Sequence, residues 1–150
     1  MAAAAVGVLA TCGIASAGGF GAFSNPQTVS IEGYSGSAEE PFITPDGRYL
    51  LFNSSEAEPD FSLQYASRIN AQTFKYQGEI QGEGVNQSGS LSGTPSLDRE
   101  GNLYFISNRS YSETLSTVYS GRFSEGLVTG VQLVEGISGE SLGKWTLMSA

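Results

Sequence analysis

The feature that most constrains the fold is a repeat with a period of 54 residues. Identical residues recur at this spacing in five pairs: Pro41 and Pro95, Gly47 and Gly101, Tyr65 and Tyr119, Arg68 and Arg122, Gly82 and Gly136. The apolar run 50–52 likewise aligns with 104–106. Repeats of this length are typical of solenoids, propellers and arrays, in which each unit buries its apolar face against a neighbour. We therefore expect repeated units in ungapped register.

Each repeat predicts four short strands. They cover 42–44, 49–52, 63–66 and 74–80 in the first repeat, and 96–97, 103–106, 117–120 and 128–134 in the second. The second run of each repeat is continuously apolar, as in a strand covered on both faces, whereas the fourth alternates and predicts one wet face. The pattern predicts an all-β fold of two four-stranded antiparallel β-propeller blades in an incomplete ring. A duplicated half of a β-sandwich fits the same pattern.

The repeat also sets the expected domain limits. The partial propeller covers 25–150, with one blade at about 41–82 and the other at about 95–136. A lone strand at 28–33 precedes them, and its segment Val29–Gly33 is similar to Gly78–Gly82. We expect it to be an outer strand of the kind that completes the last blade of a closed ring. A third blade would begin at position 149, so the chain is expected to be a truncated member of its class.

The N-terminal residues are typical of an export signal. Ala2 to Ala10 are small and apolar, and Ala15-Ser16-Ala17 offers small side chains for cleavage before Gly18. The run is too short to span a bilayer. We expect a signal peptide over 1–17 and a periplasmic or secreted protein, with lipid anchoring through Cys12 as the alternative.

Composition excludes several functions. The net charge of −8 repels phosphate backbones, so no nucleic-acid partner is expected. The chain has no His and one Cys, so neither a thiolate–imidazole zinc site nor an internal disulfide can form. We predict no cofactor and no metal.

Two fourteen-residue segments carry a family resemblance. The segments 41–54 and 94–107 share a Pro, an apolar pair, a turn with Asp-Gly or Glu-Gly, and an apolar strand that ends in Phe-x-Ser. They resemble the TolB-like, WD-repeat-related β-propeller family of exported bacterial proteins, over about residues 25–147. The resemblance implies a structural role for eight motif residues: Pro41, Asp46, Gly47, Phe52, Pro95, Glu100, Gly101 and Phe105. It also implies either an interaction protein or the propeller part of a peptidase or another hydrolase.

Catalytic motifs are weak. Ser141 lies in a Gly-x-Ser-x-Gly match at 139–143, but no His is available as its base, so we predict a loop. A carboxylate pair for glycoside hydrolysis would come from Glu39, Glu40, Asp46, Asp98 and Glu100. Asp46 and Glu100 occupy equivalent turn positions, where capping of backbone N–H groups explains both.

Three residues remain as weak ligand candidates. Asp98 follows a short strand where the other repeat has Thr44, so an acid is not structurally required there. Arg68 and Arg122 recur after the third strand, which indicates packing between blades, with a ligand role second.

The residues therefore predict a protein that is not an enzyme. We expect a binding or scaffold module for an unknown protein, small molecule or carbohydrate, with no membrane span. The alternative is the propeller portion of an exported peptidase or glycosidase whose catalytic residues lie elsewhere. Exposed apolar blade faces are expected to cause self-association.

Overall fold

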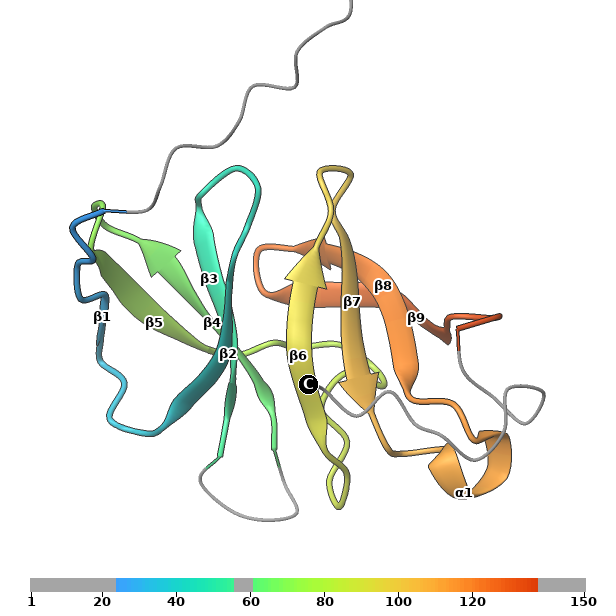
Figure 1. Ribbon diagram of the computed structural model, residues 1–150. Helices are drawn as coiled ribbons and strands as arrows, with labels where there is room; N and C mark the ends of the chain where they lie inside the picture. Colours follow the sequence, from blue (N-terminus) through green and yellow to red (C-terminus); the bar gives the residue numbers. More distant parts are fainter. Residues whose placement is uncertain (1–23, 56–60, 138–150) are drawn as a thin grey trace, which may run out of the picture.

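The computed structural model describes residues 24–55 and 61–137, which form two curled β-sheets (Figure 1). The first sheet has the strand order β1-β5-β4-β3-β2 and the second β6-β7-β8-β9. The first-sheet strands are β1 (Ser30–Glu32), β2 (Ala38–Ile43), β3 (Tyr49–Ser54), β4 (Leu63–Arg68) and β5 (Thr73–Glu79). The second-sheet strands are β6 (Ser92–Leu97), β7 (Asn102–Ser107), β8 (Val118–Ser124) and β9 (Leu127–Leu133), with the short helix α1 (Tyr111–Thr114) between β7 and β8. The predicted all-β class is confirmed.

Both motif prolines lie in the first strand of their repeat, at a sheet edge. The residue before each proline has a positive φ, 49° at Glu40 and 48° at Thr94. The pairing of β2 with β3 and of β6 with β7 shifts register at these positions. Because proline donates no hydrogen bond, it is tolerated at edges and bulges. The prolines therefore mark the same bulge in both repeats.

The strand pairing corrects the ungapped register. Leu50 pairs with Ile43 and Ala66, whereas Leu103 pairs with Leu97 and Gly121. Leu103 is thus the counterpart of Leu50 at a spacing of 53, and Gly121 the counterpart of Ala66 at 55.

The turns explain this shift. The N–H of Thr44 bonds to the carbonyl of Tyr49, but that of Asp98 bonds to Asn102, so the second turn is one residue shorter. The later connections restore the spacing, because β5 and β9 are again 54 residues apart.

Two expected equivalences fail for this reason. Arg68 pairs with Phe74 in the first sheet, and the matching pair in the second is Phe123 with Val128. The counterpart of Arg68 is therefore Phe123, and Arg122 is not an equivalent arginine. Since side chains alternate between faces, a shift of one residue places a side chain on the opposite face. Phe52 and Phe105, by contrast, are true counterparts.

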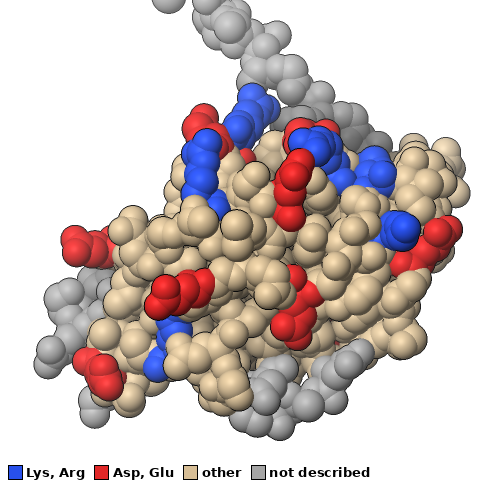
Figure 2. Space-filling model, turned by 180° about the vertical axis from the view of Figure 1, so that it is seen from behind, with Lys and Arg blue, Asp and Glu red and all other residues tan. Residues whose placement is uncertain are grey.

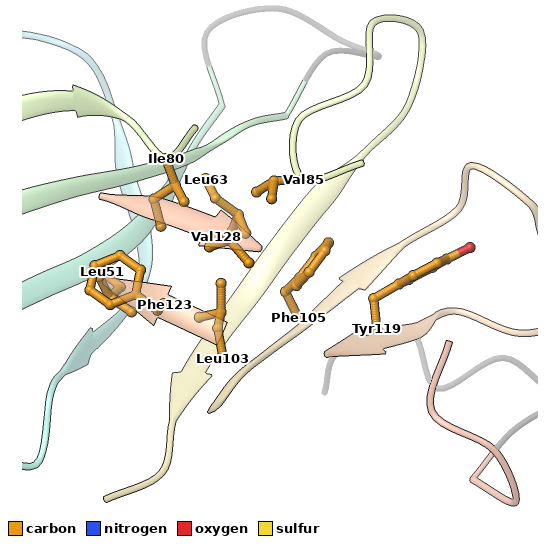
Figure 3. Close-up of a cluster of buried hydrophobic side chains, with 9 residues drawn as sticks. All are labelled: Leu51, Leu63, Ile80, Val85, Leu103, Phe105, Tyr119, Phe123 and Val128. Carbon is orange, nitrogen blue, oxygen red and sulfur yellow. The ribbon is translucent and has the colours of Figure 1, made fainter. Parts of the chain in front are cut away.

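One apolar cluster joins the two sheets (Figure 3). Its buried members are Leu51, Leu63, Ile80, Val85, Leu103, Phe105, Tyr119, Phe123 and Val128. Leu51 lies on one face of the first sheet, whereas Leu103 and Phe105 are counterparts of Leu50 and Phe52 on its other face. The front of the first unit therefore packs on the back of the second. Equivalent faces do not meet, as they would in a sandwich of two-fold-related halves.

The strand β1 adds to the first sheet in an unexpected place. It runs parallel to β5, where the N–H of Ser30 donates to the carbonyl of Gln72 at 2.9 Å. In the second sheet, the N–H of Gln81 donates to the carbonyl of Gly126 at 2.8 Å. Ser30 is thus the counterpart of Gln81, and the predicted match of Val29–Gly33 to Gly78–Gly82 is wrong by two residues.

This N-terminal segment covers an apolar face that we expected to be exposed. The Tyr34 ring packs edge-on against Phe52, with ring centroids 5.1 Å apart, and 4.9 Å from the ring of Tyr76. Phe52 is fully buried as a result. At the other end of the stack, Tyr104 and Ile106 on the second sheet are half-buried. Within the described ranges, none of the helices has the length and apolar character that a bilayer crossing requires.

Candidate functional site

Three turns meet at one end of the molecule and enclose a cleft of about 300 Å³. They are the β2–β3 turn (44–49), the β6–β7 turn (97–101) and the β8–β9 turn (122–125). We call this space the turn-end cleft. Lys and Arg side chains gather along the upper edge of the molecule in Figure 2, although the whole chain is acidic.

Asp46 caps the first turn, as predicted. Its Oδ1 accepts hydrogen bonds from the Thr44 hydroxyl at 2.6 Å and from the Arg48 N–H at 3.0 Å. Gly47, at a φ of 71°, closes the turn through its N–H to the Thr44 carbonyl. The Thr44 hydroxyl and then the Arg48 N–H lower the pKa of Asp46. This carboxylate is held in its charged form by the turn.

In the second turn the capping acid is Asp98, and the expectation for Glu100 is wrong. The Asp98 Oδ1 accepts from the Asn102 N–H at 2.8 Å, and its Oδ2 accepts from the Asn102 side-chain amide at 2.7 Å. The amide bond is the main cause of a lowered pKa of Asp98. Glu100 lies exposed on the rim. Asp98 therefore has the structural role that its place in the sequence left open.

Three arginines line the cleft, and one of them joins the two sheets. Arg48 lies 3.8 Å from Glu125 of the β8–β9 turn, both side chains being well exposed. Arg99 and Arg122 are exposed and make no ion pair or hydrogen bond with the described residues through their guanidinium groups. They are the polar groups in the cleft that remain available to a ligand.

Arg68 does not belong to this cleft. Its guanidinium donates to the carbonyls of Gly47, Asn70 and Ala71, and it lies 4.5 Å from the ring centroid of Phe74. The side chain joins two turns of the first sheet. The structure thus brings Asp98 and Arg122 together and places Arg68 elsewhere, in a packing role.

The floor of the cleft is aromatic. The ring of Phe123 packs edge-on against Tyr49 at 5.7 Å and against Tyr65 at 6.4 Å, and thereby joins the two sheets. The Tyr65 hydroxyl donates to the carbonyl of Glu125 at 3.4 Å. These contacts fix the β8–β9 turn against the first sheet, so the cleft has a rigid apolar base beneath charged walls.

A smaller hollow of about 170 Å³ lies where β2 and β6 approach each other. The Glu40 Oε2 accepts from the N–H of Thr94 at 2.8 Å, and the Thr94 hydroxyl is buried without a hydrogen-bond partner. Glu39 and Asn53 also line this hollow. Glu40 therefore connects the two bulges.

The geometry does not support acid–base catalysis in the turn-end cleft. A glycosidase needs one carboxylic acid with a raised pKa, whereas the pKa values of Asp46 and Asp98 are both lowered. Ser141 and the residues around it, like Cys12 and the predicted signal peptide, lie outside the described residues. Over 24–55 and 61–137 no three metal-ligating side chains cluster together.

No similar protein accompanies this geometry. In comparisons with known proteins, no family model, no curated protein and no solved structure matched the chain.

Sequence reasoning missed one residue that organises the loops beneath the sheets. The Asn86 side chain accepts from the N–H of Leu63 at 2.8 Å and donates to the carbonyls of Leu63 and Ile80, both at 3.0 Å. It fixes the connection between the two sheets. In the sequence Asn86 stands in a Ser- and Gly-rich loop, where nothing distinguishes it from its polar neighbours.

Proposed function

We propose that this chain is a non-catalytic binding module of an exported repeat protein, and that the turn-end cleft is its ligand site. The observation that carries the proposal is the division of labour among the charges there. Asp46 and Asp98 are bonded into their own turns, whereas Arg99 and Arg122 are not engaged by the described residues.

This division favours an anionic ligand. A guanidinium group presents a planar fork of donors that matches a carboxylate, and such charge-assisted pairs are stronger than neutral hydrogen bonds. The rings of Tyr49 and Phe123 below would accept an apolar part of the same molecule. The ligand class is therefore a small carboxylate that also carries an apolar body.

Binding of phenylacetate and of glucuronate, followed by isothermal titration calorimetry at low salt, tests this proposal. We expect saturable binding of at least one, and a loss of about tenfold in affinity for Arg122→Gln, since one charge-assisted hydrogen bond contributes about 1.5–3 kcal/mol. The matched control is Lys75→Gln, an exposed cation on β5 outside the cleft. Absence of binding, or equal losses in both variants, would refute the proposed site.

We also propose that the two four-stranded units are consecutive propeller blades of a TolB-like repeat protein. Front-to-back stacking supports this, as do the repeated bulges before Pro41 and Pro95 and the repeated parallel contacts at Ser30 and Gln81. Units related by rotation about one axis would repeat their contacts in this way.

The alternative function, the propeller portion of an exported hydrolase, has a separate test. The purified chain is assayed against ester, peptide and glycoside substrates, alongside Ser141→Ala. Activity that disappears in Ser141→Ala would overturn the non-catalytic proposal. Binding without turnover in either protein would support it.

A further inference from the structure

A second concave site lies along the outer edge of β9. It is a groove of about 690 Å³, bounded on one side by residues 82–84 and on the other by residues 127–131. We call it the β9 groove. It shares no lining residue with the turn-end cleft. In Figure 1, β9 is the strand of the second sheet farthest from β6 in the pairing order.

The first sheet shows what fills the equivalent space. There the edge of β5 is paired with three residues of β1, and Ile31 and Tyr34 pack into the apolar cluster on that face together with Tyr76. The counterparts in the second sheet follow from the shared hydrogen bonds of Ser30 and Gln81. Ile31 corresponds to Gly82, Tyr34 to Val85 and Tyr76 to Gly130.

The groove exists because these counterparts are small. Two bulky side chains of the first sheet are replaced by hydrogen atoms at Gly82 and Gly130, and a tyrosine is replaced by Val85. A Cβ built on Gly130 would meet no atom within 4 Å, so the space above it is open. Leu127, half exposed, forms an apolar rim.

The backbone of this edge is also incompletely paired. Gln81 bonds to the carbonyl of Gly126 and accepts from the N–H of Val128 at 2.8 Å, but the bridge with Leu127 is not continued. From Thr129 to Leu133 the outward polar groups of β9 make no hydrogen bond to another described residue. Unpaired strand edges beside pockets for alternate side chains bind extended peptides by strand addition.

We propose that the β9 groove binds an extended peptide segment of a partner protein, which adds to β9 as a parallel strand and continues the pairing that Gln81 begins. An aliphatic or aromatic side chain of the peptide enters the hollow above Gly82 and Gly130. Glu83 on the rim disfavours acidic residues next to that side chain. The internal precedent is β1, a short parallel strand whose Ile31 and following Tyr34 fill the same space on β5.

The probe is a labelled peptide with the sequence of residues 28–36, Thr-Val-Ser-Ile-Glu-Gly-Tyr-Ser-Gly, titrated with the full chain by fluorescence anisotropy. We expect saturable binding at one site. Leu127→Arg is expected to weaken it about tenfold, because the rim loses an apolar contact. Ile69→Arg is the matched control, since Ile69 is 51% exposed and Leu127 50%, and Ile69 lies outside the groove. A peptide with serine in place of both its isoleucine and its tyrosine is expected not to bind.

Hydrogen exchange locates the peptide. Slower exchange of the amides from Thr129 to Val131 in the presence of the peptide supports the proposal. Protection confined to Thr73–Lys75 would mean that the peptide replaces β1 on the first sheet, and would overturn it. Absence of binding, or equal weakening by Leu127→Arg and Ile69→Arg, would overturn it as well.

Discussion

Gly82 packs directly against the backbone carbonyl of Val128, so that a Cβ at position 82 would overlap the carbonyl oxygen. The contact lies where the chain passes from the first sheet to the second, next to the bridge between Gln81 and Leu127. The link between the sheets therefore depends on a glycine, for reasons of space as well as of conformation.

The first prediction concerns this contact. Gly82→Ala is expected to lower the free energy of unfolding by about 2–4 kcal/mol, because it adds a steric clash to a φ of 140°. Gly130→Ala separates the two effects, since Gly130 has a φ of 65° but open space around it. We expect that variant to lose about 1 kcal/mol in urea denaturation. Equal losses would show that the close approach is not tight.

The second prediction concerns the aromatic contact between the sheets. Phe123→Ala removes a buried ring that packs on Tyr49 and Tyr65, and is expected to cost about 3 kcal/mol or more in urea denaturation. Ile69→Ala, at a half-exposed side chain, is expected to change stability by less than about 0.5 kcal/mol. A small effect of Phe123→Ala would mean that the sheets do not depend on this contact.

The third prediction concerns the buried amide of Asn86. Asn86→Ala leaves the N–H and carbonyl of fully buried Leu63 without their side-chain partner, which is expected to cost about 1–3 kcal/mol. Gln87→Ala, at the exposed neighbouring residue, is the control and is expected to be neutral. Similar melting temperatures for both variants would show that water replaces the amide.

The fourth prediction concerns pH. The pKa of Asp98 is lower in the folded state than in the unfolded chain, so its carboxylate stabilises the fold above about pH 4. This stabilisation is lost as the pH falls through the folded pKa. Asp98→Asn should therefore melt below the wild type at pH 7, and the difference should vanish in strong acid. Glu100→Gln, whose carboxylate makes no hydrogen bond in the turn, should match the wild type throughout. A pH-independent difference for Asp98→Asn would contradict this role.

The fifth prediction concerns self-association, for which the front of the second sheet is the remaining surface. Tyr104 and Ile106 are half-buried there, on the face that in the first sheet packs against its neighbour. We expect oligomers in sedimentation velocity, reduced by Ile106→Lys but not by Ile43→Lys at an exposed residue of β2. A monodisperse wild-type monomer would defeat this prediction.

The strands were predictable because each is a compact apolar run between turn residues. The limits of β2 and β6 differ by 54 residues, and so do those of β5 and β9, as the repeat predicts. The inner strands were misaligned because chance identities, Tyr65 with Tyr119 and Arg68 with Arg122, matched an ungapped register. Identity of residue type carries no information on which face a side chain occupies.

The turn-end cleft was predicted only in part. Asp46 and Gly47 were recognisable because Asp-Gly is a strong turn signal. Asp98 could not be assigned a role, because its function depends on Asn102 and on a turn that is one residue shorter. The joining of turns from two sheets around Arg99 and Arg122 is a property of tertiary packing, which no local pattern encodes.

The opposite shifts of β7 and β8 bear on how the two copies could have diverged. A single deletion in the β6–β7 turn would have turned the apolar side of β7 outward unless the whole strand slid along its partners. The strand did slide, and Leu103 and Phe105 took the places of Leu50 and Phe52. A longer passage through α1 and a tighter β8–β9 turn then returned the outer strand to its original phase. Length changes in this lineage are thus tolerated as a matched set, and any one of them alone would leave a strand out of step with its sheet.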